Sequence, residues 1–291
     1  METQAAQSLL TIVGALILAT LVALAGSQHG VTVAGLPVFA LCAIVCFVIQ
    51  WVAYVPAYLK QTEHYYDLTG SLTYLLVIGI AALAGGLTAP NLLLLGLIAI
   101  WAIRLGSFLF RRVRAAGEDV RFANLKTRPI RFLMTWTLQG LWVFVTLAAA
   151  LAAITSAEPR SELGWQAMVG AAVWAAGMLI EVTADRQKSR FRADPANQGR
   201  FITTGLWAWS QHPNYFGEIL LWVGIAIIAL PVLVGWQLVT LISPVFVWLL
   251  LTKGSGIPLL QANAQRRWGE DPDYQAYRSR TPLLVPRPPA G

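Results

Sequence analysis

Long apolar stretches, separated by short polar segments, make up most of the chain. A helix needs about 20 mostly apolar residues to cross a bilayer, and eight stretches meet this requirement. These stretches are residues 8–26, 33–58, 70–87, 91–110, 132–154, 165–182, 215–230 and 233–251. The pattern therefore predicts an all-α membrane protein, built as a bundle of about eight transmembrane helices.

Three features of this pattern bear on the number of helices. No Lys or Arg precedes residues 8–26, and the stretch is too long for a signal-peptide core, so we expect a retained span. Ala89-Pro90 leaves only a very short connection between two spans. Leu230-Pro231 fits either a turn between two helices or a kink in one long helix.

Composition and charge fit a membrane protein. The chain is 57% hydrophobic and 12% charged, whereas soluble domains have about 25% charged residues, so a soluble single domain is excluded. The formal net charge is +7, from 21 basic and 14 acidic residues. If successive loops alternate between the two sides, all basic residues except Arg104 and Arg160 fall on the side of both termini.

The positive-inside rule places this basic side in the cytoplasm. We therefore expect both termini in the cytoplasm and a multi-pass protein of a bacterial inner membrane. The basicity then reflects topology, and no nucleic acid partner is expected. Cys42 and Cys46 lie four residues apart in an apolar run with no neighbouring His or acid, so they are interpreted as core residues and no metal site is predicted.

Four ionisable residues lie in or at the edge of the predicted spans: Asp67, Arg104, Glu181 and Glu218. Such residues are costly in a membrane and are candidates for function. Alternatively, Arg104 reaches out to the membrane surface, the acids are solvated at helix ends, and Asp67 is a helix N-cap. Because the predicted topology places all four in the cytoplasmic half, we favour a polar cavity open to the cytoplasm.

The segment 181–192 has no Gly or Pro and is predicted to extend the sixth helix out of the membrane. Glu181, Asp185, Lys188 and Arg192 are 4, 3 and 4 residues apart, which places them on one helical face. This spacing fits a chain of ion pairs. It also fits a site in which the acids bind ribose or amide groups and the cations bind phosphate.

Pro213 suits the first turn of the seventh helix, where free backbone N–H groups attract anions. Asn214 and Glu218 are four residues apart and face the same way. A His before a Pro is usually a cap or loop residue, but His212 lies among polar residues at a membrane entrance, and we favour a functional role.

The segment from Glu181 to Glu218, the fourth span with its Trp and Arg, and residues 254–260 resemble a known family. The strongest part is Asp185…Arg192…Gly205-Leu206-Trp207…His212-Pro213-Asn214-Tyr215-Phe216-Gly217-Glu218. Over roughly residues 40–287 the chain resembles bacterial membrane proteins of the steroid 5α-reductase-like superfamily, of the type called domain of unknown function 1295. The resemblance implies a seven-helix reductase-like domain, residues 33–291, preceded by an extra helix, residues 1–32.

The same resemblance implies an integral membrane oxidoreductase. Such enzymes use NADPH, bound from the cytoplasmic side, to reduce a carbon–carbon double bond conjugated to a ketone in a lipophilic, 3-oxo-steroid-like substrate. By position, Asp67 stands where these reductases have a catalytic Glu, and Trp101 where they have a catalytic Tyr. Tyr66, or its neighbours Tyr65 and Tyr74, could supply the missing hydroxyl.

The resulting candidate residues form two groups. The catalytic candidates are Asp67, Tyr66, Trp101 and Glu218. The candidates for holding NADPH are Arg104, Arg111, Glu181, Asp185, Lys188, Arg192, Arg200, His212, Asn214, Tyr215 and Lys253. The expected partners are a lipophilic small molecule and membrane lipids, and the sequence predicts neither a particular substrate nor an oligomeric state.

Two other functions stay open. The pattern His-Pro-x-Tyr-x-Gly-Glu also resembles isoprenylcysteine carboxyl methyltransferases, which bind S-adenosylmethionine. The many cations on one side of the chain favour NADPH instead, because its 2′-phosphate and pyrophosphate need several of them. A non-enzymatic lipid-binding protein would leave Arg104 and Glu218 without a purpose.

Overall fold

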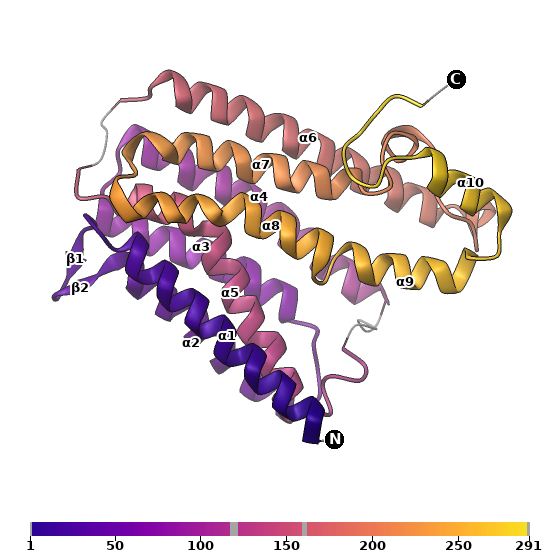
Figure 1. The fold of residues 1–291 in the computed structure, drawn as a ribbon, viewed down its shortest axis with the longest axis horizontal. Coiled ribbons are helices and arrows are strands. Elements are labelled where there is room, and N and C mark those ends of the chain that lie inside the picture. Colours follow the sequence, from indigo (N-terminus) through magenta and orange to yellow (C-terminus); the bar gives the residue numbers. More distant parts are fainter. Residues whose placement is uncertain (1, 117–121, 159–161, 290–291) are drawn as a thin grey trace. The chain divides into compact units, whose positions relative to one another are not determined.

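A computed structural model describes residues 2–116, 122–158 and 162–289 of the chain (Figure 1). The chain divides into two compact units. Unit 1 comprises residues 1–168 and 226–243, and unit 2 comprises residues 169–225 and 244–291.

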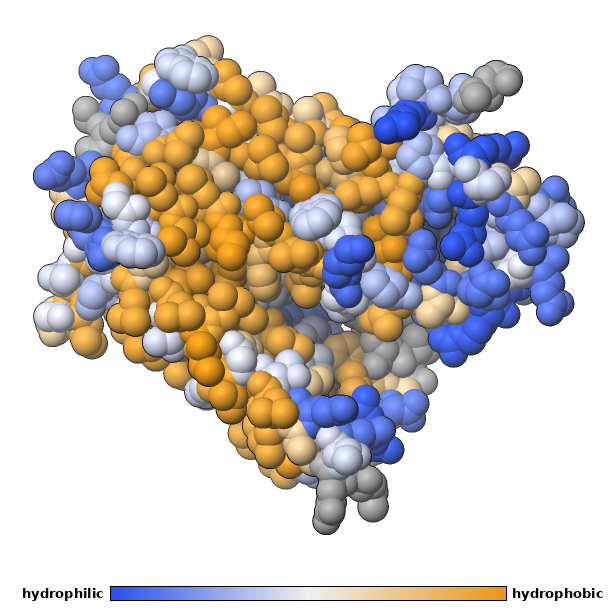
Figure 2. Space-filling view, viewed as in Figure 1, coloured by the Kyte–Doolittle hydropathy of each residue, from blue (hydrophilic) through white to orange (hydrophobic). Residues whose placement is uncertain are grey.

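Within the described residues, eight helical segments are long and apolar enough to cross a membrane. The predictions of an all-α architecture with eight spans and of a multi-pass membrane protein are therefore confirmed. Large apolar side chains on the outer surfaces of the spans are exposed, as Leu10 and Leu24 are on the first of them. Such side chains suit contact with lipid tails. Figure 2 shows apolar residues over this first helix and polar residues over the C-terminal helices.

The centre of unit 1 is a helix rich in small residues, α5. In the most apolar 18-residue part of this helix 89% of the residues are buried. Every residue from 143 to 154 is buried. The alanines in this stretch let neighbouring helices approach closely. The long helices of unit 1 are α1 (Glu2–Gly26), α2 (Val38–Leu59), α3 (Tyr66–Gly85), α4 (Ala89–Ala116) and α5 (Pro129–Ile154).

The predicted start of the second span at residue 33 is wrong. A short hairpin, β1 (Thr32–Val33) and β2 (Leu36–Pro37), precedes α2. Ala34 and Gly35 both have positive φ angles, 50° and 78°. This conformation makes a tight two-residue turn and prevents a helix from forming there.

The connection at Leu230-Pro231 is a turn between two helices and not a kink. It consists of two 3₁₀ segments, η3 (Leu230–Val232) and η4 (Gly235–Leu241), with Gly235 at a positive φ of 54°. The side chain of Gln237 donates to the carbonyl of Gln28, which attaches the turn to the end of α1.

Two ion pairs and a side-chain hydrogen bond lie at one end of unit 1. The Arg128 side chain donates to Gln4 Oε1 at 2.6 Å, which brings the start of α1 to the start of α5. At the same end Lys126 pairs with Glu63, and Arg112 pairs with Asp67. The starts of α1, α3 and α5 therefore share an end with the last part of α4, as the alternating loop assignment requires. Arg121 and Arg160, which also entered that assignment, lie outside the described residues.

Unit 2 contains most of α6 and α7 and the C-terminal helices. Its helices are α6 (Trp165–Ala193, of which residues from 169 belong here), α7 (Pro213–Ala229, up to residue 225), α8 (Ile242–Lys253, from residue 244), α9 (Ile257–Trp268) and α10 (Pro272–Arg280). The continuation of α6 to Ala193 confirms the predicted extension beyond residue 182. The start of α7 at Pro213 is confirmed as well.

Glycines bring α6 and α7 into backbone contact. A Cβ on Gly177 would lie 2.5 Å from the backbone N of Leu221 and 2.6 Å from the carbonyl O of Gly217. One helical repeat further along, a Cβ on Gly224 would lie 2.5 Å from the carbonyl O of Gly170. The seven-residue spacing on both helices keeps the small residues at one crossing interface.

This contact leads to a test of stability. Gly217→Ala should lower the free energy of unfolding by about 1–3 kcal/mol, because the added methyl group meets rigid backbone atoms. Gly79→Ala in α3 is the matched control, since nothing lies within 4 Å of its added Cβ. Thermal unfolding of the detergent-solubilised proteins measures both, and equal melting temperatures would contradict the close approach.

Candidate functional site

Unit 2 contains a cluster of buried polar side chains where α6 faces the start of α7. Glu181, Asp185, His212 and Glu218 are only 2%, 8%, 7% and 9% exposed, respectively. Buried polar groups of this kind are costly unless they are paired. Their concentration in one region of a membrane protein therefore marks the candidate site.

The close approach of α6 and α7 positions this cluster. A Cβ on Gly217 would lie 2.7 Å from the backbone N of Glu181, so the next residue, Glu218, lies beside α6. One turn further out on α6, Asp185 Oδ1 accepts a hydrogen bond of 3.2 Å from Asn214 Nδ2. The predicted residues Glu181, Asp185, Asn214 and Glu218 are therefore brought together.

The segment before α7 is attached to α6 through Trp207, in the 3₁₀ helix η2 (Gly205–Ala208). The indole N–H of Trp207 donates to the carbonyl of Ala184 at 3.0 Å. Gln187 Oε1 accepts from the backbone N–H of Leu206 at 2.9 Å. The ammonium group of Lys188 lies 4.2 Å from the centroid of the Trp207 ring, a cation–π contact.

The C-terminal helices hold this segment from its other side. The Tyr277 hydroxyl donates to the carbonyl of Trp207 at 2.7 Å, and burial raises the pKa of Tyr277. The ring of Phe201 packs edge-on against Trp268 and Tyr274, with centroids 5.7 Å and 5.1 Å away. Further along the tail, the backbone N–H of Arg287 donates to the carbonyl of Trp209.

His212 is buried and neutral. Burial and the nearby charge of Lys188 lower the pKa of His212 to about 3. Its ring stacks on that of Tyr215, with centroids 5.6 Å apart and planes inclined by 14°. Among the described residues, Nδ1 of this imidazole has no hydrogen-bond partner. His212 therefore places an uncharged, buried imidazole ring at the start of α7.

The remaining predicted cations of unit 2 lie further out. Arg192, Arg200 and Lys253 are exposed. From Glu181 to Arg192 the helix rises by about 16 Å, at 1.5 Å per residue. Along this length α6 changes from buried acids to a half-buried Lys188 and then to an exposed Arg192.

Asp67 lies in unit 1, as the second residue of α3. The N-cap of this helix is Tyr65, so the alternative that Asp67 is the cap is wrong. Its carboxylate forms an ion pair of 3.9 Å with Arg112. Arg111, the neighbouring cation predicted to hold the cofactor, is exposed.

The other predicted residues of unit 1 have packing partners. The Tyr66 hydroxyl donates to the carbonyl of Thr135 at 3.0 Å. Trp101 is buried, and its ring meets that of Tyr74 edge-on at 5.0 Å. The Arg104 guanidinium lies 5.3 Å from the ring centroid of Phe108. These contacts give all three side chains a structural role in unit 1.

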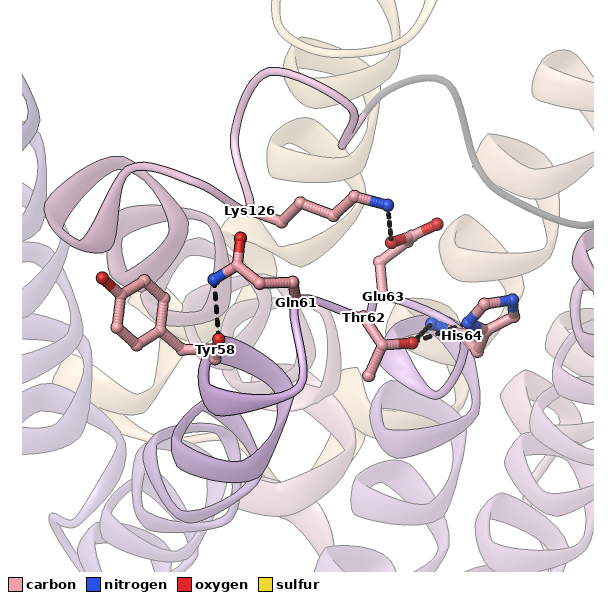
Figure 3. Close-up of polar contacts among 6 residues, drawn as sticks. All are labelled: Tyr58, Gln61, Thr62, Glu63, His64 and Lys126. Carbon is pink, nitrogen blue, oxygen red and sulfur yellow. Dashed lines mark hydrogen bonds and ion pairs between the residues drawn. The ribbon is translucent and has the colours of Figure 1, made fainter.

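The sequence interpretation missed a buried ion pair in unit 1. Figure 3 shows Lys126 reaching from the segment before α5 to Glu63, in the turn between α2 and α3. Lys126 Nζ lies 3.1 Å from Glu63 Oε2, and the Glu63 side chain is completely buried. A Glu in a short polar loop is ordinarily exposed, so the sequence carries no signal for this pair.

A family model with the description "Protein of unknown function (DUF1295)" matches residues 51–281. The chain belongs to the DUF1295 family. None of the curated proteins matches it. The DUF1295 match begins within α2, so α1 lies outside it, and it includes the whole polar cluster of unit 2.

Breaking the two ion pairs of unit 1 should lower the free energy of unfolding by different amounts. Glu63→Gln should lower the free energy of unfolding by about 3 kcal/mol, because it leaves a largely buried ammonium without its carboxylate. Asp67→Asn should cost about 0–1 kcal/mol, since the Arg112 side chain is 46% exposed and water screens the pair. Chemical denaturation of both variants measures this difference, and equal losses would contradict the burial of Glu63.

Because the pKa of His212 is lowered, the free energy of unfolding should depend on pH. This pKa is about 3 in the folded protein and 6.5 ordinarily, so below pH 6.5 the unfolded chain binds a proton that the folded chain does not. Above pH 6.5 the ring is neutral in both states, and His212 does not lower the free energy of unfolding. Below pH 6.5 the free energy of unfolding decreases by about 1.4 kcal/mol per pH unit as the pH falls toward 3. Unfolding between pH 7.5 and 5.5 should show this extra slope in the wild type and not in His212→Gln. If the free energies of unfolding of the two proteins change with pH in parallel, the pKa of His212 is not lowered in the folded protein.

Proposed function

We propose that this DUF1295 protein is a membrane-embedded, NADPH-dependent reductase that binds its cofactor in unit 2. Its substrate would be a lipophilic ketone with a conjugated carbon–carbon double bond. The observation that carries the proposal is the change along one face of α6, from buried acids to exposed cations. NADPH has a matching polarity, with uncharged hydroxyl and amide groups and strongly anionic phosphates.

The inner part of the cluster suits the uncharged groups of a nucleotide. Carboxylates accept hydrogen bonds from ribose hydroxyls, and Glu181 and Asp185 are the acids available on α6. The Asn214 amide beside Asp185 and the neutral ring of His212 add groups that donate and accept. The stacked pair of His212 and Tyr215 offers an aromatic surface next to them.

The outer part suits phosphate. Lys188 and Arg192 are four residues apart and lie on one face of α6. Arg200 follows in the adjoining turn, and Lys253 ends α8 within the same unit. Arginine binds phosphate through two parallel N–H groups, which gives both energy and orientation. A methyl donor without phosphates would need fewer of these cations, so NADPH is favoured over S-adenosylmethionine.

The reaction balances as NADPH, a proton and the unsaturated ketone giving NADP⁺ and the saturated ketone. Bound NADPH would supply a hydride, forming a new C–H bond at the β-carbon of the substrate. The electron pair of the double bond moves to the carbonyl oxygen as an enolate, and the α-carbon then takes up the proton. The protein binds and orients the cofactor, while the cofactor carries the chemistry. The choice of this reaction rests on the resemblance of the Asp185 to Glu218 segment.

Cofactor binding provides the test. NADPH should raise the melting temperature of the purified wild-type protein, and Arg192→Ala should weaken its binding at least tenfold, the effect of losing about 1.4 kcal/mol. Arg190→Ala is the matched control, since it removes another exposed cation from the opposite side of the same helix. Equal NADPH affinity in both variants would remove Arg192 from the site.

S-adenosylmethionine in the same assay distinguishes the two families. A rise in melting temperature with S-adenosylmethionine, and none with NADPH, would overturn the reductase proposal in favour of a methyltransferase. If NADPH binds, oxidation of bound NADPH by a panel of lipophilic enones, followed at 340 nm, then identifies the substrate class.

A further inference from the structure

Unit 1 has an open hollow of about 650 Å³ at the end that carries its ion pairs. It is lined by Lys60, Thr62, His64, Tyr65, Phe110, Val113 and Arg114. Three spans meet at this hollow. Lys60 directly follows the span Val38–Leu59, Tyr65 precedes the span Tyr66–Gly85, and Arg114 ends the span Ala89–Arg114. The hollow therefore lies where spans end, at the depth of lipid headgroups.

The lining combines cations with apolar surface. Lys60 and Arg114 come from the ends of different helices, and both are exposed. Phe110 lies one helical turn before Arg114 on α4, on the side that leads into the span. Among the described lining residues none is acidic. The hollow thus suits a ligand with an anionic head and an apolar body.

The turn that forms one wall of the hollow is fixed in place. Figure 3 shows three contacts that hold it. Gln61, at a positive φ of 50°, donates to the carbonyl of Tyr58 at 2.7 Å. The Thr62 hydroxyl lies 2.6 Å from His64 Nδ1. Between them, Glu63 points away to its buried pair with Lys126. A wall held in this way lowers the entropy cost of binding a ligand.

We propose that this hollow binds the phosphate of an acidic phospholipid from the surrounding leaflet. Lys60 and Arg114 bind the phosphodiester, and Phe110 and Val113 contact the adjoining part of the lipid. Basic residues at span ends attract anionic headgroups in this way. The apolar part of the lining favours a lipid over free inorganic phosphate. The site belongs to unit 1 and is independent of the cofactor proposed for unit 2.

The test uses the full-length protein in mixed micelles. Phosphatidylglycerol or phosphatidylcholine is added, and bound lipid is counted by native mass spectrometry. Wild type should retain phosphatidylglycerol about thirtyfold more strongly than phosphatidylcholine, as expected for two basic residues. The double variant Lys60→Gln/Arg114→Gln should lose this preference. Both side chains are exposed, so the variant should fold.

Arg266→Gln/Arg267→Gln is the control, because it removes the same charge from exposed positions on α9. This variant should keep the preference for phosphatidylglycerol. Equal loss in both double variants would show a general effect of net charge and overturn the site. Displacement of phosphatidylglycerol by millimolar inorganic phosphate would show that the hollow selects free phosphate, which would overturn the lipid assignment.

Discussion

The polar cluster of unit 2 depends on the backbone contact between α6 and α7. Side chains at Gly177 and Gly217 would hold the helices apart, since each added Cβ would lie within 2.7 Å of the opposite backbone. With the helices this close, Asp185 and Asn214 lie within hydrogen-bond distance. The same contact buries Glu181 and Glu218, which a looser packing would leave to water or lipid. Small residues at the crossing thus decide which polar groups meet at the helix ends.

Several hydrogen bonds attach the segment before α7 to its neighbours beside the cluster. Trp207 is central among them, because it donates to the backbone of α6 and accepts from Tyr277 of α10. The tail continues along the same segment as far as Arg287. The segment 199–211 is therefore held between α6 and the C-terminal helices. For the cofactor proposed above, a surface fixed in this way would lower the entropy cost of binding.

The sequence predicted the spans well, because a bilayer requires about 20 apolar residues for each crossing. It also predicted the extension of α6 and the start of α7, since both follow from local signals such as the absence of Gly and Pro or the presence of Pro213. It failed at residues 33–37, where a positive φ at Ala34 interrupts an apolar run. The pair of Glu63 and Lys126 was also missed. Its residues are far apart in sequence, and burial of a loop acid depends on tertiary packing alone.

In the candidate site too, the sequence predicted what depends on local spacing and missed what depends on tertiary packing. The helical spacing of Glu181, Asp185 and Lys188 predicted a common face, but not their partners. Lys188 lies over Trp207, and Asp185 accepts a hydrogen bond from Asn214. These two residues therefore have partners outside α6. The cluster therefore belongs to the packing of α6, α7 and the segment between them. This packing is also the reason that its acids stay buried where the helix leaves the membrane.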